Sequence, residues 1–215
     1  MNTVNQITKT NDFNKIALER RSIKKYDPTV KISREEMTEI LAEATRAPSS
    51  INLQPWRFLV IESDEAKATL LPLAMFNQRQ VETAAAVVAI FGDLRHEENA
   101  DEIFNAAVEA GHMPADVRDQ QLPFAKAYYE NISDAARKDI ALIDSGLVAM
   151  QLMLVARAHG YDTNAIGGYD KTKIAEAFGM EKDRYVPVML LSMGKADSEG
   201  HGSGRLPVEK VAEWK

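Results

Sequence analysis

The sequence contains no cysteine among its 215 residues. This absence excludes disulfide bonds, thiol nucleophiles, iron–sulfur clusters and cysteine-based zinc sites. Basic residues are the minority, with 26 Lys and Arg against 32 Asp and Glu, and the net charge of −6 disfavours a broad nucleic-acid surface. Long hydrophobic runs are missing too: the apolar stretch 84–91 is far shorter than the roughly 20 residues that span a bilayer. We therefore expect neither a nucleic-acid partner nor a membrane partner.

Several catalytic signatures are also missing. The four histidines form no H-E-x-x-H pattern, so no metal site is expected. No G-x-G-x-x-G follows a predicted strand and no P-loop pattern occurs, which disfavours the two common nucleotide-binding folds. A nucleophile elbow on an inner strand and a paired acid–base couple of carboxylates are absent as well. These absences favour chemistry carried out by a bound cofactor.

What is present is an ordinary globular composition, with 45% hydrophobic and 27% charged residues. The length predicts a single domain over residues 1–215, with an N-terminal extension at 1–11 and a C-terminal arm at 195–215. The opening residues Met1–Gln6 lack the apolar segment of a signal peptide. Together with the missing cysteine, this predicts a cytoplasmic location.

Apolar periodicity predicts alternating helices and strands. Helices are expected at residues 12–20, after a capping box at 33–36, and at 64–71 and 133–159. Strands are expected at residues 56–61, 86–91 and 185–194. The helix at 133–159 has apolar side chains at helical spacing and ends before Gly160, so we expect it to be central and buried. The pattern indicates an α+β fold with few strands and one long helix.

Two polar segments could bind a ligand. Residues Arg20–Lys25 combine two guanidinium groups, a hydroxyl and two ammonium groups, which suits a phosphate, although a solvated basic helix end is the alternative. Residues Ala47–Trp56 hold two hydroxyls and two amides between prolines. They could hydrogen-bond the edge of a heterocycle, or simply form a turn.

Two glycine-containing segments add to this set. In Asn164–Tyr169, Gly167 and Gly168 allow the backbone to approach a ligand closely, or to turn. In His201–Pro207, Arg205 lies in a flexible loop that could close over a phosphate, or belong to a surface arm.

Taken together and in this order, these segments resemble the nitroreductase family of flavin-dependent oxidoreductases. The resemblance covers about residues 13–207 and rests on the motifs Arg20-Arg21-Ser22, Pro48-Ser49-Ser50-x-Asn52-x-Gln54-Pro55-Trp56, Ile166-Gly167-Gly168-Tyr169 and Gly204-Arg205-Leu206-Pro207. It implies an α+β fold with a central, mostly antiparallel sheet flanked by helices around a long central helix. It also implies an intertwined homodimer with swapped terminal arms and FMN at the subunit interface.

The resemblance also implies roles for individual residues. Arg20, Ser22 and Arg205 would hold the FMN phosphate, and Arg21 and Lys24 would lie along the ribityl and pyrimidine side. Lys24 would stabilise the anionic reduced flavin electrostatically. The remaining cofactor-binding residues would be Pro48, Ser49, Ser50 and Asn52 from the partner subunit, and Asn77, Gln80, Gly167 and Gly168.

Two positions depart from the family pattern. Gln80 stands where some members carry a second lysine near the pyrimidine, so the reduced flavin should be less favoured. Gly167 stands where some members carry a glutamate, which removes a side chain from the mouth of the site. Both departures bear on the substrate and leave the cofactor assignment unchanged.

The activity implied is a ping-pong reaction, in which NAD(P)H reduces FMN and leaves before a nitroaromatic or quinone-type acceptor binds. The flavin carries the chemistry and the protein brings two flat molecules together, so no catalytic side chain is assigned. The segment 96–131 would cover the substrate face. Its aromatic residues either form that cover or pack between helices; they are Phe104, Phe124, Tyr128 and Tyr129.

Three alternatives remain open. The protein could be a specialised flavin enzyme, such as a reductive dehalogenase or a flavin-fragmenting enzyme. It could be a non-catalytic flavin-binding or storage protein, which NAD(P)H turnover would exclude. It could also be a structural α+β dimer without a cofactor, which would be colourless and ignore added FMN.

Overall fold

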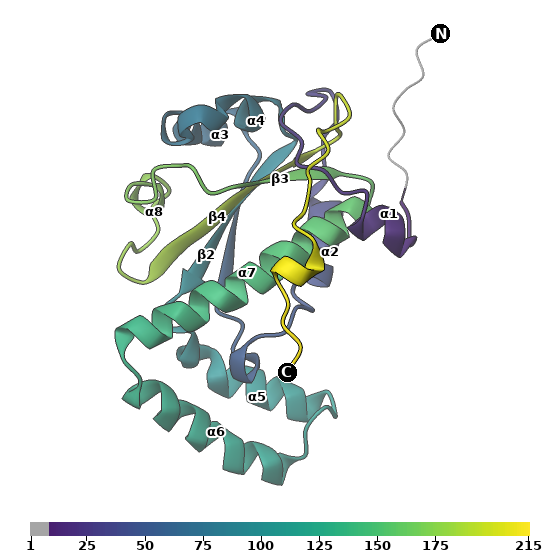
Figure 1. The fold of residues 1–215 in the computed structure, drawn as a ribbon. Helices are drawn as coiled ribbons and strands as arrows, with labels where there is room; N and C mark the ends of the chain where they lie inside the picture. Colours follow the sequence, from purple (N-terminus) through teal and green to yellow (C-terminus); the bar gives the residue numbers. More distant parts are fainter. Residues whose placement is uncertain (1–8) are drawn as a thin grey trace.

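A computed structural model describes residues 9–215 and is shown in Figure 1. Its centre is a four-stranded sheet with the strand order β1-β2-β4-β3 and antiparallel pairing throughout. The strands are β1 Trp56–Ile61, β2 Ala86–Asp93, β3 Asp162–Ile166 and β4 Tyr185–Gly194. The expected α+β class and antiparallel sheet are confirmed.

The inner strands show why this sequence forms a sheet. All eight residues of β2 are buried, and Val88 and Ile90 face one helical layer while Val87 and Phe91 face the other. β4 is also an inner strand, yet it contains Pro187, which has no N–H for the ladder. The register between β2 and β4 shifts beside Phe91, opposite this proline, so a bulge accommodates it.

The expected strands have the right positions, but one strand was missed. β2 runs two residues beyond the expected 86–91, and β3 lies where the sequence indicated only a glycine turn. β3 reads Asp-Thr-Asn-Ala-Ile, so it lacks the apolar pattern of a buried strand. All of its residues except Ala165 are buried nonetheless, because β4 covers one edge and residues Ser22 and Ile23 pair with Thr163 on the other.

The helices surround the sheet on both faces. They are α1 Phe13–Ala17, α2 Arg34–Ala44, α3 Asp64–Leu70, α4 Gln78–Thr83, α5 Ala100–Glu109, α6 Ala115–Asn131, α7 Asp134–Ala158 and α8 Ile174–Ala177. The 3-10 turns are η1 Ser50–Asn52, η2 Leu71–Leu73, η3 Met75–Asn77, η4 His96–Asn99 and η5 Val208–Lys210. One apolar core joins α2 and α7 to the sheet, and a second joins α3, α4 and α8 to its opposite face.

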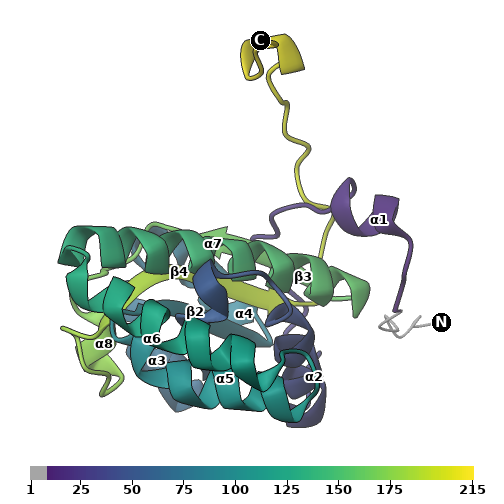
Figure 2. The same ribbon diagram turned by 90° about the horizontal axis from the view of Figure 1, so that it is seen from below.

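The helix starts follow the expected capping, but the first helix is shorter than expected. Ser33 Oγ accepts a hydrogen bond from Glu36 N (3.1 Å), which satisfies a free amide at the start of α2. The expected helix at 12–20 is wrong in length: α1 has five residues, none of them buried. α1 lies at the edge of the molecule beside the end of α7, so its apolar side is not enclosed in a core (Figure 1 and Figure 2).

The long helix α7 crosses the sheet diagonally and contacts all four strands as well as α2 (Figure 1). It ends as expected, since Gly160 follows with a positive φ of 89°. In residues 9–215, α7 is the helix that is long and apolar enough to cross a membrane. Here its buried side packs against the sheet, so this composition serves the core of the fold.

The expectation that α7 is buried is only half right. Ile143, Leu147 and Met150 are 64%, 44% and 41% exposed. Their spacing puts them on one face of the helix, and we call these three residues the α7 stripe. The opposite face supplies the buried residues, among them Val148 and Leu152. The sequence pattern therefore combined two apolar faces of the helix, and residues 9–215 bury only one of them.

The C-terminal segment extends from the body, whereas the first described residues are tied to it. Beyond Gly200 the C-terminal segment is exposed except for the half-buried Ala212, and Figure 2 shows it projecting past α7. Of the expected N-terminal extension 1–11, residues 1–8 lie outside the described part of the chain. Thr10 N donates to Ala158 O (2.8 Å), which ties the start of the described chain to the end of α7.

Candidate functional site

The edge strand β3 arranges two of the predicted ligand-binding segments. Ser22 pairs with Thr163 near the start of β3, and Ile23 N donates to Thr163 O (3.1 Å). Gly167 and Gly168 follow directly after its end at Ile166. Strand residues rise about 3.3 Å each, so the basic segment and the glycine pair are separated by about 13 Å along β3.

The basic segment presents alternate side chains outward. Ile23 is buried against the body, so its neighbours Ser22 and Lys24 point the other way and are exposed. Among residues 9–215, neither Arg20 nor Lys24 forms an ion pair. Arg21 instead donates to the backbone oxygens of Leu18 and Arg20, both at 3.2 Å. Cations and a hydroxyl are therefore free to meet an anion at this end of β3.

The other end of β3 carries a polar network. Gln80 Nε2 donates to Asn77 Oδ1 (2.9 Å), and Asn77 Nδ2 donates to Gly168 O (2.8 Å). A Cβ atom placed on Gly167 would have no neighbour within 4 Å, so the backbone there faces open space. A flat ligand could approach the peptide groups of Gly167 and Gly168 directly. The structure thus brings together Asn77, Gln80 and the glycine pair.

The segment Pro48–Gln54 adopts a strained conformation. Ile51, Asn52 and Gln54 have φ values of 51°, 56° and 48°. The left-handed region costs an L-residue roughly 1–2 kcal/mol, and Ile51 is β-branched, which makes it a genuine outlier. Such strain tends to gather at functional sites.

Several contacts hold this loop in place. Gln54 N donates to Ser49 Oγ (3.1 Å), and Leu53 is fully buried against α5 and α6. Ser50 donates two hydrogen bonds to Asp144 of α7, from its amide (2.9 Å) and from its hydroxyl (3.2 Å). No local sequence pattern marks Asp144 as a partner of this loop, because it is a single acidic residue in an apolar helix.

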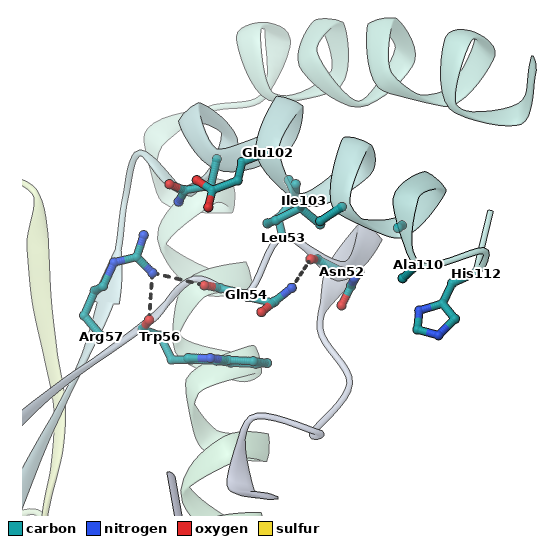
Figure 3. A pocket seen from close by; sticks show the side chains of 12 residues that line it. Asn52, Leu53, Gln54, Trp56, Arg57, Glu102, Ile103, Ala110 and His112 are labelled. Atoms are coloured by element: carbon teal, nitrogen blue, oxygen red, sulfur yellow. Dashed lines mark hydrogen bonds between the residues drawn. The ribbon is translucent and has the colours of Figure 1, made fainter. Parts of the chain in front are cut away.

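A cavity of about 510 Å³ lies between this loop and α5 (Figure 3). Trp56 forms one wall, and Ile103 and Ala110 of α5 face it. Arg57 donates to the backbone oxygens of Gln54 (3.2 Å) and Trp56 (2.8 Å). Its guanidinium also pairs with the fully buried Asp93 (3.0 Å), so the exit of the loop is fixed to β2. The sequence analysis missed Arg57 and Asp93 too.

Within one chain the predicted site is divided. The loop Pro48–Gln54 lies beside α5 at one end of the molecule, whereas α3 and α4 lie at the other end (Figure 1). Arg205 lies in the exposed arm, where its Nη1 donates to Ser203 Oγ (2.7 Å). The structure therefore groups Arg20, Ser22, Lys24, Asn77, Gln80, Gly167 and Gly168 along β3. It leaves Pro48, Ser49, Ser50, Asn52 and Arg205 apart from them.

The aromatic residues of segment 96–131 divide into two groups. Phe104 and Tyr129 are buried with Leu53 in the core of α5 and α6, which is the packing role that the sequence left open. This burial also raises the pKa of Tyr129 to about 12. Phe124 and Tyr128 are exposed and stay candidates for a cover. The sequence analysis overlooked Phe76, which is 98% exposed beside Asn77.

Two buried hydroxyl groups lie on residues next to the β3 site. Thr163 Oγ1 and Tyr169 Oη have no hydrogen-bond partner within residues 9–215; Thr163 pairs with Ser22 through the backbone, and Tyr169 follows Gly168 in the chain. Burial raises the pKa of the Tyr169 hydroxyl well above its usual range, so it is a neutral donor. The cations and hydroxyl at the start of β3 and the open glycine backbone after its end suit an elongated ligand with a phosphate at one end and a ring at the other. FMN has this shape, so the residues present fit a flavin cofactor.

The fold and the candidate site are those of a cofactor-binding α+β protein, and comparisons with known proteins identify the family. The model of the nitroreductase family matches residues 17–195. YdgI of Bacillus subtilis, provisionally named an NAD(P)H nitroreductase, is 60% identical over 207 residues, which cover 96% of this chain and 99% of YdgI. The CLA biosynthesis enone reductase of Lactiplantibacillus plantarum is 42% identical over 190 residues, 88% of each chain.

A solved structure agrees with these matches. The crystal structure of a provisionally assigned nitroreductase from Exiguobacterium sibiricum, in complex with FMN, has a TM-score of 0.96 and 63% identity. The match covers 98% of this chain and 100% of that one. The chain therefore belongs to the nitroreductase family, as its motifs indicated. It is an oxidoreductase of that family.

Proposed function

We propose that the protein is an FMN-dependent NAD(P)H oxidoreductase that passes electrons to nitroaromatic or quinone-type acceptors by a ping-pong mechanism. The observation that carries this proposal is the arrangement along β3, with cations at its start and an open glycine backbone about 13 Å away. The names of YdgI and of the FMN-bound Exiguobacterium protein support the same cofactor and reductant.

Each residue along β3 has a proposed task. Arg20 and Ser22 bind the phosphate, together with Arg205, because guanidinium groups and a hydroxyl offer charge-assisted hydrogen bonds. Lys24 places a positive charge beside the ring. The ring is oriented by the Asn77–Gln80 pair and by the backbone of Gly167 and Gly168. When bound, FMN supplies the hydride transfer, and the protein supplies orientation and electrostatics.

The divided site supports a homodimer with FMN at the subunit interface. Pro48, Ser49, Ser50 and Asn52 would reach the flavin bound by the other subunit. Two features of the single chain support this arrangement: the α7 stripe is an apolar surface that residues 9–215 leave uncovered, and the arm that carries Arg205 leaves the body (Figure 2). In the dimer, the α7 stripes of the two subunits would pack together, and each C-terminal arm would extend over the partner subunit.

A second acceptor class deserves a direct comparison. The Lactiplantibacillus plantarum relative is an enone reductase at 42% identity, so an activated C=C bond is an alternative acceptor. With Gly167 rather than a larger side chain at the ring end, the site offers room for either class. A cytoplasmic location and a single FMN-binding domain over residues 1–215 complete the proposal.

Visible spectroscopy tests this function. We expect flavin bands in the purified protein, bleaching by NADH or NADPH without oxygen, and recovery when a nitroaromatic, a quinone or an enone is added. Ping-pong kinetics would give parallel double-reciprocal lines. A flavin spectrum that neither nucleotide bleaches would indicate a storage role, and no flavin even after FMN addition would overturn the cofactor assignment.

A further inference from the structure

Asp144 is a buried carboxylate in the middle of α7 that lacks an ion-pair partner in the described part of the chain. Its side chain is 2% exposed, and it makes no ion pair with any residue in the range 9–215. By contrast, the other fully buried acid, Asp93, pairs with both Arg57 and Arg184. An unpaired buried carboxylate is costly, so a protein retains one only where its hydrogen bonds are needed.

Both oxygens of Asp144 bind the same residue. Oδ2 accepts from the Ser50 amide (2.9 Å) and Oδ1 accepts from the Ser50 hydroxyl (3.2 Å). The first bond fixes the backbone at residue 50 and the second fixes the rotamer. Because the hydroxyl proton is used, the Ser50 oxygen can offer a ligand only its lone pairs. Asp144 therefore fixes the position of Ser50 and leaves the Ser50 hydroxyl oxygen only the role of a hydrogen-bond acceptor.

The strained turn that follows Ser50 depends on a fixed position of Ser50. The next residues, Ile51 and Asn52, have left-handed backbones, which an unsupported loop would abandon for an unstrained conformation. Leu53 holds the far side of this strained turn in the α5–α6 core. The turn is thus held on two sides. Asp144 holds it through charged hydrogen bonds, and Leu53 holds it through apolar contacts.

Asp144 also adjoins the proposed dimer surface. Its neighbours along α7 are Ile143, one residue before it, and Leu147, three residues after it, and both belong to the exposed α7 stripe. The helix that would meet the partner subunit therefore also carries the side chain that fixes the loop. The side chain that anchors the loop and the α7 stripe therefore lie on the same helix.

We propose that Asp144 is a positioning residue for the cofactor site: it holds Ser50 and the strained turn in the conformation that meets the flavin across the subunit interface. This inference rests on the proposed placement of Ser50 at the flavin.

The test compares FMN binding and thermal stability in matched variants of the full-length protein. Asp144→Asn keeps the shape but can no longer accept both bonds, and Asp144→Glu keeps the charge but moves it by one methylene. We expect both to raise the Kd for FMN about tenfold, the effect of losing a charged hydrogen bond, and to change the circular dichroism of the bound flavin. Ser50→Ala should do the same, and the double variant should be no weaker than the worse single variant.

The control is Glu36→Gln, because Glu36 is a half-buried carboxylate on α2 that accepts from Tyr161 Oη (2.6 Å) away from the loop. It should lower the melting temperature and leave the Kd for FMN and the flavin signal unchanged. If the Asp144 variants behave like this control, or if Asp144 and Ser50 act additively, the positioning role is wrong. Wild-type protein that binds no FMN would instead contradict the proposed function itself.

Discussion

Arg20 lies near the start of β3 with its guanidinium unpaired within residues 9–215, and in the same range Arg205 donates hydrogen bonds only to its own loop. Neither side chain contributes to the packed core. Replacing either one should therefore affect a bound anion far more than the fold.

We expect Arg20→Ala and Arg205→Ala to raise the Kd for FMN by 10-fold or more, since each removes about 1.5–3 kcal/mol of charged hydrogen bonding. The melting temperature of the FMN-free protein should stay nearly constant. Arg34→Ala is the control, because Arg34 is exposed on α2 and has no proposed part in the site. Titration of flavin fluorescence measures the affinities, and wild-type affinity in both variants would contradict the phosphate assignment.

At this scale local patterns yield candidate ligand-binding residues, but not the residues that hold those candidates in place. Motif residues such as Ser22 and Gly168 are grouped by type and spacing, so a pattern can reveal them. Asp144 and Arg57 act through contacts with residues distant in the sequence, Asp144 with Ser50 and Arg57 with Asp93. No local pattern encodes such a contact.

Among the elements, α7 has two features that can be tested separately, its N-cap and the α7 stripe. Its N-cap is Ser133, whose Oγ accepts from Ala136 N (3.2 Å). Ser133→Ala should lower the free energy of unfolding by about 1 kcal/mol, the usual value of a lost cap. Urea denaturation measures the change, and Ser133→Asp, which can still cap the helix, should keep most of the stability. Equal losses in both variants would show that the cap contributes little.

The α7 stripe gives a second prediction for the same helix. Leu147→Asp should convert the proposed dimer to a monomer, because burying an unpaired carboxylate in an apolar interface is costly. Light scattering measures the mass in solution. Ala135→Asp adds the same charge to an exposed position in the first turn of α7 and should leave the dimer intact. A monomeric wild-type protein that retains FMN would contradict the interface site.

The sequence predicted three of the strands and the helices α1, α2, α3 and α7, but gave no bounds for α4, α5, α6 or α8, and it misjudged the elements whose burial depends on distant partners. Apolar periodicity located α2, α7 and the three apolar strands. β3 is polar and becomes buried only through β4 and residues 22–23, so its own pattern could not reveal it. α1 shows the reverse case. Its sequence is amphipathic, but none of its residues is buried in the described chain.

For the whole molecule, buried tyrosines determine how stability responds to alkaline pH. Burial raises the pKa of Tyr26, Tyr129, Tyr161 and Tyr169 above the usual 10.0. Above pH 10 the unfolded chain releases these protons while the folded protein keeps them, so stability falls as the pH rises. Burial lowers the pKa of Lys67, which acts in the opposite sense, but it is one group against four.

We therefore expect the free energy of unfolding to decline steadily between pH 10 and 12, and to be insensitive to these tyrosines below about pH 9. Urea denaturation at a series of pH values measures the decline. Tyr129→Phe removes a buried hydroxyl that has no partner within residues 9–215, so the decline should become shallower in this variant. An unchanged slope would mean that Tyr129 ionises equally in both states.

The division of the site between the β3 edge and the Pro48–Gln54 loop has a genetic consequence. Consider one defective allele altered at Arg20 and another altered at Ser50, expressed in the same cell. In a mixed dimer, one of the two sites would combine both defects, whereas the other would be built from two intact halves. Such alleles would complement each other, and two alleles damaged on the same side would not.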